Sequence, residues 1–240
     1  MKIYILLLTF FFIHLNNFSQ NIRGKITYQY DIQDTNLGEN VKNQNVVNKF
    51  KRNLKDNKDK IKYELLFKNS EANYKLIKNL IVENNNSLNY AILLTGGREE
   101  VYINLKEQAT LKRIEIFGEI FIVKSNSKKE WTLTQETKII AGYKCFKAVL
   151  KKEENNNKIK KPDIIAWYSP QIPISFGPKG YCNLPGLILE LKVGPIIYFA
   201  TKIELNPKEE IEVKRITNGK IVTEEEFDNI LIGIDKKKRN

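Results

Sequence analysis

The 240-residue chain has a formal net charge of +12 and contains one histidine, two cysteines and one methionine. The histidine is His14 and the methionine is Met1. Because histidine is the usual general base near neutral pH and the commonest metal ligand, the composition excludes Ser-His-Asp catalysis, Cys-His catalysis and a histidine-based zinc site beyond residue 14. A methionine-rich copper site is excluded in the same way. The basic residues are interrupted by acidic ones, as in residues 49–64, so we expect no nucleic-acid partner.

The first twenty residues have the three parts of a secretory signal peptide. Lys2 supplies a positive start, and residues 3–15 are almost wholly apolar. This stretch is shorter than the roughly 20 residues of a membrane-spanning helix. We predict that residues 1–19 are a signal peptide cleaved after Ser19; cleavage after Gln20 and an uncleaved anchor are the alternatives. The expected product is soluble after cleavage, without a transmembrane span, and lies in the periplasm or cell envelope.

Alternating apolar and polar side chains dominate the first half of the remaining chain. In residues 25–30, Ile26, Tyr28 and Tyr30 share one face, a pattern that indicates a half-buried antiparallel strand. We predict further strands over residues 60–68, 73–78, 88–94 and 101–105. The expected fold is mainly β, with a curved antiparallel sheet or half-open barrel formed by a single domain over residues 20–240.

Two other segments differ from this pattern. Residues 34–59 are polar and weakly patterned, so we predict a long loop or ragged edge strands. Near the C-terminus, Thr223 and Glu226 have the spacing of a helix capping box. An apolar face follows at helical spacing, which predicts a short C-terminal helix near the mouth of the half-open barrel. The residues of this face are Phe227, Ile230, Leu231 and Ile234.

The two cysteines are Cys145 and Cys182. In an exported protein an even number of cysteines favours a disulfide, so we predict a Cys145–Cys182 bond. The alternative is that one or both are buried thiols.

Six of the seven prolines lie between residues 162 and 195, interleaved with glycines. Proline fixes φ, and shaped loops on β scaffolds are often functional. Two interpretations are open. Pro185-Gly186 is a type II turn that begins a core strand, with Leu184 plugging the sheet, or aromatic and aliphatic side chains line the mouth of an apolar ligand site. The predicted ligand or partner residues are Trp167, Tyr168, Ile172, Phe176, Tyr181 and Leu184.

Catalytic patterns are weak. Ser125 and Lys128 have a Ser-x-x-Lys spacing, but they lie in a polar turn without the companion motifs of that enzyme class. Adjacent acidic residues such as Glu99-Glu100 point to opposite faces of a strand. We expect Glu136 and Glu190 to form structural pairs with Lys138 or Lys144. We therefore predict no enzymatic activity, no cofactor and no metal.

The sequence resembles the GLPGLI family of exported proteins. The resemblance is carried by four ordered blocks: the strand pair around Tyr63 and Tyr74, WTLTQETKIIAGYKCFKA at residues 131–148, AWYSPQIPISFGP at residues 166–178, and LPGLILEL at residues 184–191. Asn183 stands where the motif has its first glycine, and asparagine tolerates the left-handed region better than most residues. The signature residues are Asn183, Leu184, Pro185, Gly186, Leu187 and Ile188. The resemblance implies export and a β-rich fold, and it implies no activity.

These observations together predict a non-catalytic binding protein of the cell envelope. Its partner would be an apolar ligand or an envelope protein, held by residues 166–190. The alternative is an accessory factor for outer-membrane protein assembly or transport, and a carboxylate-based hydrolase is the less favoured third interpretation.

Overall fold

The computed structural model describes residues 22–33, 43–77, 85–150 and 164–239, with side chains described as far as residue 234. The predicted signal peptide and its cleavage site lie outside these residues. In the part of the chain that is described, no helix is long and apolar enough to cross a bilayer.

In the described residues, twelve strands form a single sheet with the spatial order β12-β6-β5-β4-β3-β2-β1-β11-β10-β9-β8-β7. Neighbouring strands are antiparallel, except that β12 runs parallel to β6. The strand bounds are β1 (Arg23–Ile32), β2 (Tyr63–Lys68), β3 (Glu71–Leu76), β4 (Glu100–Asn104), β5 (Ala109–Ile116), β6 (Glu119–Asn126), β7 (Trp131–Ile140), β8 (Tyr143–Leu150), β9 (Ile164–Ser169), β10 (Leu187–Val193), β11 (Ile196–Leu205) and β12 (Lys220–Thr223). The predicted fold class, a mainly β chain with a curved and open sheet, is confirmed.

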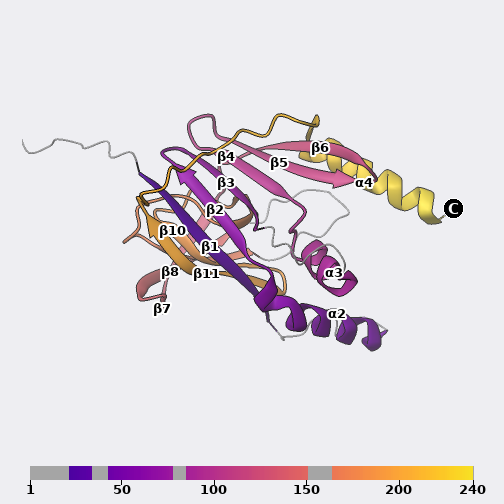
Figure 1. Cartoon of the computed structure of the whole chain (residues 1–240), viewed down its shortest axis with the longest axis horizontal. Coiled ribbons are helices and arrows are strands. Elements are labelled where there is room, and N and C mark those ends of the chain that lie inside the picture. Colours follow the sequence, from indigo (N-terminus) through magenta and orange to yellow (C-terminus); the bar gives the residue numbers. More distant parts are fainter. Residues whose placement is uncertain (1–21, 34–42, 78–84, 151–163, 240) are drawn as a thin grey trace, which may run out of the picture.

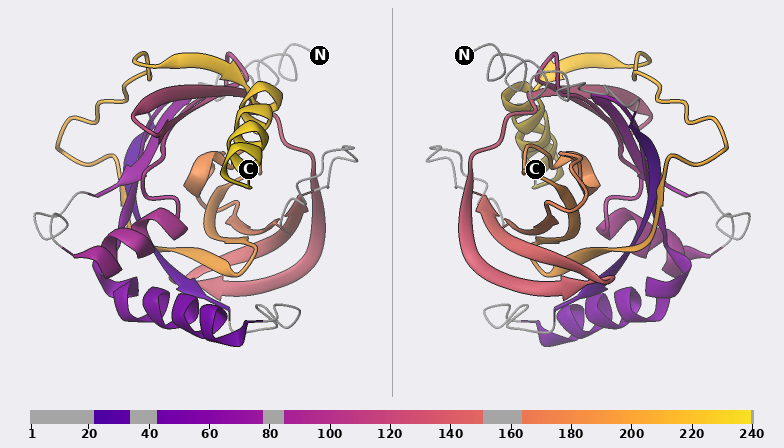
Figure 2. Two further views of the ribbon diagram at one scale, coloured as in Figure 1. Left: turned by 90° about the vertical axis from the view of Figure 1, so that its right-hand side faces the viewer. Right: turned by 90° about the vertical axis from the view of Figure 1, so that its left-hand side faces the viewer.

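Figure 2 shows that this sheet curls until its two halves face each other, with the segment between β9 and β10 inside the curl. Inward-facing side chains alternate along the strands, as in Ile26, Tyr28 and Tyr30 of β1, which are at most 1% exposed. The inner segment packs against the opposite half of the sheet, because the Phe176 ring lies 6.2 Å from that of Phe67 in β2. The hydrophobic core therefore fills the concave side of the sheet.

The helices lie at the margins of the sheet (Figure 1). They are α2 (Gln44–Asn57), α3 (Asn86–Leu94) and α4 (Glu224–Arg239), with short 3-10 turns η1 (Lys58–Lys60) and η2 (Pro178–Gly180). The C-terminal helix α4 was predicted, and its capping box is present. The Thr223 amide donates to Glu226 Oε2 at 2.8 Å, and the Glu226 amide donates to Thr223 Oγ1 at 3.1 Å.

Two predictions of local structure were wrong. Residues 88–94 belong to α3 and are not a strand, because Asn85 caps the Leu88 amide at 3.0 Å and Leu88, Ala91 and Ile92 bury one helical face. The loop predicted over residues 34–59 contains α2, whose inward side chains include Val47 and Leu54. In both segments the 3–4 spacing of buried residues decides the structure.

The segment between β11 and β12 crosses the convex face of the sheet (Figure 1). Asn73 of β3 holds it through two hydrogen bonds with the Lys214 backbone, at 2.8 and 2.6 Å. Val213 and Ile216 pack on a small convex-face cluster formed by Tyr102, Leu111 and Ile122. This segment leads into β12, which pairs with β6 at one edge of the sheet.

Candidate functional site

The six side chains of the predicted ligand site differ in burial. Ile172, Phe176 and Leu184 are 1% exposed and Tyr168 is 5% exposed, and all four belong to the main core. Trp167 and Tyr181 are half-buried. Because Trp167 and Tyr168 are neighbours in β9, they face opposite sides of the sheet.

The Trp167 ring packs against an ion pair on its own face of the sheet. Lys138 Nζ is 4.4 Å from the centre of the Trp167 ring and 2.7 Å from Glu190 Oε1. The predicted pairing of Glu190 is therefore confirmed with Lys138. Glu136 pairs with Lys147 at 2.7 Å, which corrects the expectation that its partner is Lys138 or Lys144. The pairing differs because the register between β7 and β8 shifts between Leu133 and Thr137, and Lys147 of β8 lies opposite this bulge, which contains Glu136.

The signature segment closes the junction between β6 and β7. These strands follow each other in the chain but stand at or near opposite edges of the sheet. The Ser127 carbonyl, between them, accepts hydrogen bonds from Asn183 Nδ2 at 2.8 Å and from Cys182 Sγ at 3.3 Å. Trp131 Nε1 at the start of β7 donates to the Cys182 carbonyl at 2.9 Å. We call these contacts of Ser127, Trp131, Cys182 and Asn183 the seam clasp.

The backbone of this segment agrees with one prediction and corrects another. Asn183 has φ 68°, the left-handed conformation expected for the residue that replaces glycine. Pro185-Gly186 does not form the predicted type II turn, because the Leu187 amide donates to the Ile172 carbonyl at 2.9 Å and Gly186 has φ 154°. A Cβ on Gly186 would lie 2.1 Å from the Ser169 carbonyl oxygen, so backbone contact dictates this geometry. Leu187 then begins a core strand, β10, in which Leu187, Ile188, Leu189 and Leu191 are buried, as the first interpretation predicts.

The predicted disulfide is not formed. Cys145 and Cys182 are both buried free thiols. Cys182 Sγ faces Ser127 in the seam clasp, whereas Cys145 Sγ lies 3.5 Å from the Tyr143 carbonyl in its own strand. Burial raises the pKa of Cys145 to about 11 and that of Cys182 to about 12, so both are neutral thiols at physiological pH.

A buried charged cluster lies on the concave face of the sheet. Lys179 Nζ in η2 is 3.2 Å from Glu99 Oε2, and Lys112 Nζ in β5 is 3.5 Å from the same oxygen. The Lys179 side chain is 13% exposed, and its ammonium lies 5.7 Å from the centre of the Tyr198 ring. Burial would raise the pKa of Glu99, but Lys179 and Lys112 outweigh it and hold that pKa below its usual range. Burial lowers the pKa of Lys179 despite the pull of Glu99.

Tyrosine hydroxyls surround this cluster. Tyr198 donates to the Thr95 carbonyl at 2.7 Å, and Tyr63 donates to Thr95 Oγ1 at 2.5 Å. The Tyr74 ring stacks on Tyr63 with ring centres 5.4 Å apart, and its buried hydroxyl has no hydrogen-bond partner in the part of the chain that the structure describes. Burial raises the pKa of all three phenols above the usual range, so they act as neutral groups. Sequence reasoning missed this cluster, and its only local signal was a lysine inside a Gly-Pro-Lys-Gly turn.

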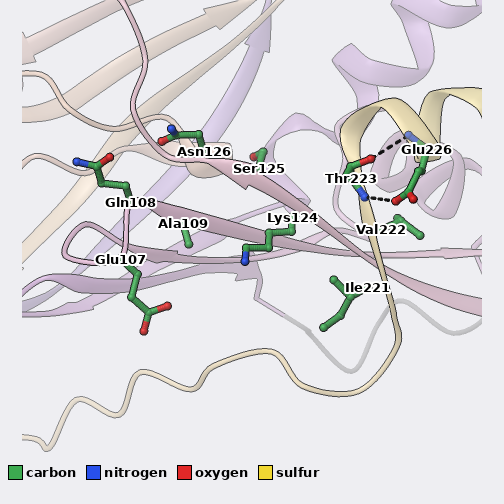
Figure 3. Close-up of a pocket in the computed structure, with 10 residues that line it drawn as sticks. All are labelled: Glu107, Gln108, Ala109, Lys124, Ser125, Asn126, Ile221, Val222, Thr223 and Glu226. Carbon is green, nitrogen blue, oxygen red and sulfur yellow. Dashed lines mark hydrogen bonds between the residues drawn. The ribbon is translucent and has the colours of Figure 1, made fainter.

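An open pocket lies at the other end of the sheet, beside the edge strand β12. It has a volume of about 600 Å³ (Figure 3) and opens widely to solvent. Its lining combines polar side chains with two apolar residues of β12: Glu107, Gln108, Ala109, Lys124, Ser125, Asn126, Ile221, Val222, Thr223 and Glu226. Within the described residues, no group of three histidine, cysteine, aspartate or glutamate side chains is placed to hold a metal ion.

Comparisons with known proteins add a fold and one short sequence match. A family model described as "Protein of unknown function (Porph_ging)" matches residues 151–190, which include β9 and the seam-clasp residues Cys182 and Asn183. No curated protein matches the chain. The match leaves membership of the GLPGLI family a prediction.

Two solved structures are similar to the chain. "Structure of PNGF-II in P21 space group" is similar with a TM-score of 0.50 and 16% identity, over 88% of this chain and 33% of that chain. "Structure of PNGF-II in C2 space group" has a TM-score of 0.47 and 19% identity, over 85% of this chain and 31% of that chain. The chain thus spans about a third of the length of the PNGF-II chain. At 16% identity and a TM-score of 0.50, the first similarity shows a shared fold alone.

Proposed function

We propose that the chain is exported to the cell envelope and acts there as a non-catalytic binding protein for an envelope protein. Three features support this proposal. The first twenty residues have the pattern of a signal peptide. The concave face of the sheet carries the main hydrophobic core of the described residues. The widely open pocket beside β12 offers surface to a partner.

The packed interior is the observation that favours an envelope protein over an apolar ligand as the partner. An apolar ligand needs an enclosed apolar cavity. In the described residues, side chains of β10 and of the segment between β9 and β10 lie buried on the concave side of the sheet, where such a ligand would bind. Phe176, Leu184 and Leu187 are at most 1% exposed. The pocket beside β12 is lined by polar as well as apolar side chains, which suits a rim of contact with another protein.

The buried charged cluster supports a structural role better than a catalytic one. Its single carboxylate, Glu99, is shared between Lys179 and Lys112. A hydrolase of the paired-carboxylate type needs two carboxylates with separated pKa values. The Lys179 ammonium is also shielded from solvent, so a substrate would have no direct path to it.

Site-specific photo-crosslinking in the native cell tests the proposal. A photoreactive amino acid is placed at Ile221 of β12, which is 67% exposed, or at Ile139 of β7, which is 66% exposed. The two positions match in residue type, exposure and edge-strand location, so nonspecific capture should be equal. We expect a discrete protein adduct from Ile221 that is absent from Ile139. No adduct at Ile221, or the same adducts at both positions, would overturn the proposal.

The identity of the captured protein also decides the alternative. An outer-membrane assembly or transport component would make the chain an accessory factor. Trp167 and Tyr181 keep enough exposure to be tested as further contacts by single alanine substitutions. Phe176 is unsuitable for this purpose, because its removal would leave a cavity against Phe67.

A further inference from the structure

The C-terminal part of the chain wraps around one edge of the sheet and touches both of its faces. The segment between β11 and β12 crosses the convex face, β12 pairs with β6 at the edge, and α4 lies on the concave side (Figure 2). The Phe227 ring of α4 packs against the Phe121 ring of β6, with ring centres 5.8 Å apart. We call residues 206–239 the C-terminal clip.

The apolar contacts of the clip are separate from the main core. On the convex face, Val213 and Ile216 pack on the small cluster around Tyr102. On the concave side, β12 and α4 share one cluster with β6, whose buried members are Phe121, Val123, Val222 and Phe227. Between residues 206 and 234 only three side chains are buried, those of Ile211, Val222 and Phe227.

The polar contacts of the clip are also weak. β12 is four residues long, three of its side chains are exposed, and it pairs with β6 in parallel, which is slightly less stable per residue than antiparallel pairing. The Arg215–Glu107 ion pair is about half exposed on both sides, and such pairs contribute little. An isolated helix of 16 residues, the length of α4, is marginal in water, so α4 depends on its contact with β6.

We propose that the C-terminal clip opens from the β6 edge as one unit while the rest of the sheet stays folded. Regions with few buried apolar contacts open at lower free energy than a core, and they do so in contiguous cooperative units. β12 and α4 open together because Val222 and Phe227 share one cluster. Opening melts α4 and uncovers the β6 edge with Phe121 and Val123. Because opening is a property of the purified chain, this device is independent of the proposed binding partner.

Hydrogen exchange followed by mass spectrometry on the purified mature chain measures the opening. We expect the amides of β12 and α4 to exchange about a hundredfold or more faster than those of the central strands β1 and β2. Equal protection of the clip and of the central strands would overturn the inference, because the clip would then open only when the whole sheet unfolds.

Two phenylalanines give a matched test of whether the clip and the main core open separately. Each is buried and pairs with another ring, Phe227 with Phe121 at 5.8 Å and Phe176 with Phe67 at 6.2 Å. Phe227→Ala leaves a cavity under α4, so exchange in β12 and α4 should rise about a hundredfold or reach the unprotected rate. Phe176→Ala should instead speed exchange in the central strands.

Tryptophan fluorescence in urea reports on the main core, because the two tryptophans, Trp131 and Trp167, pack against it. Phe176→Ala should lower the unfolding midpoint or give a chain too unstable to purify. Phe227→Ala should leave the midpoint nearly unchanged, because the clip is already open at the urea concentrations that unfold the core. Equal losses of midpoint, or a Phe227→Ala chain that does not fold, would reject separate opening.

Gly233→Ala tests from the opposite direction whether the clip opens as one unit. Gly233 is exposed in α4, and a Cβ there would meet no atom within 4 Å, so alanine should stabilise the helix without adding a contact. Exchange should slow about threefold in α4 and by the same factor in β12, although β12 is unchanged. Slowing confined to α4 would show that the helix opens without the strand and would reject the single unit.

Discussion

Replacing Glu99 by glutamine should destabilise the protein strongly, because it leaves a buried ammonium without its counter-ion. The substitution keeps the shape and one oxygen acceptor but removes the charge shared by Lys179, at 3.2 Å, and Lys112, at 3.5 Å. The Lys179 side chain is 13% exposed, so water cannot replace the carboxylate. Breaking a buried ion pair from one side costs about 3–5 kcal/mol. Since Glu99 is itself 26% exposed, we expect about 3 kcal/mol.

Two further variants show whether burial is the cause. Glu136→Gln removes a carboxylate that is 58% exposed and 2.7 Å from Lys147, and it should cost less than about 1 kcal/mol, as exposed pairs do. The double variant Glu99→Gln/Lys179→Met removes both buried charges. Because an apolar replacement of a buried pair is often nearly neutral, it should recover most of the loss.

Urea unfolding followed by tryptophan fluorescence measures these differences from the midpoints at constant slope. A loss in Glu99→Gln no larger than that in Glu136→Gln would refute the reasoning, because Lys179 would then be effectively solvated. Failure of the double variant to recover stability would assign the loss to packing around Glu99 and not to the unpaired charge.

The pH dependence of stability supplies an independent check on the same pair. The folded-state pKa of Glu99 lies below the reference value of 4.5. Its contribution is therefore complete above the unfolded pKa and is lost as the pH falls from about 4.5 through the lower folded value. Glu99→Gln should lack this part of the acid destabilisation, so its stability should differ less from wild type at pH 3 than at pH 7.

The remaining predictions concern the seam clasp and the thiols. Asn183→Ala should cost about 2–4 kcal/mol in urea unfolding, because it removes the 2.8 Å bond to Ser127 and places alanine at φ 68°; Asn183→Gly should cost less, and equal losses would show that the backbone conformation does not matter. Cys145 and Cys182 should react with a thiol reagent only after unfolding, and an intact mass 2 Da below the reduced value would contradict the free thiols.

The sheet was predictable because its signal is local. Apolar and polar side chains alternate in residues 25–30 and 60–68, and this alternation identifies the inward face of each strand. The capping box of Thr223 and Glu226 marks the start of α4. Residues 88–94 were mistaken for a strand because a short apolar run fits both patterns. Asn85, which caps the helix, was the local signal that distinguishes them.

The charged cluster was not predictable in this way. Glu99 and Lys179 are 80 residues apart in the chain, and neither belongs to a recurring motif. Only the curl of the sheet brings η2 against β3 and β4, where the pair forms. The same curl explains why Phe176 and Leu184, which one sequence interpretation placed at the mouth of a ligand site, are buried in the core.

The backbone of the inner segment indicates what its signature residues do. Lys179 and Asn183 both have left-handed φ, 58° and 68°, at a cost of roughly 1–2 kcal/mol each for non-glycine residues. The Lys179–Glu99 pair and the Asn183–Ser127 bond are the contacts that offset this strain. The polar side chains of Lys179 and Asn183 are thus used in contacts within the protein, and they are not available to bind a partner. Recognition by a partner is better served by β12, whose outer edge has no strand neighbour among the described residues and whose Ile221 is exposed.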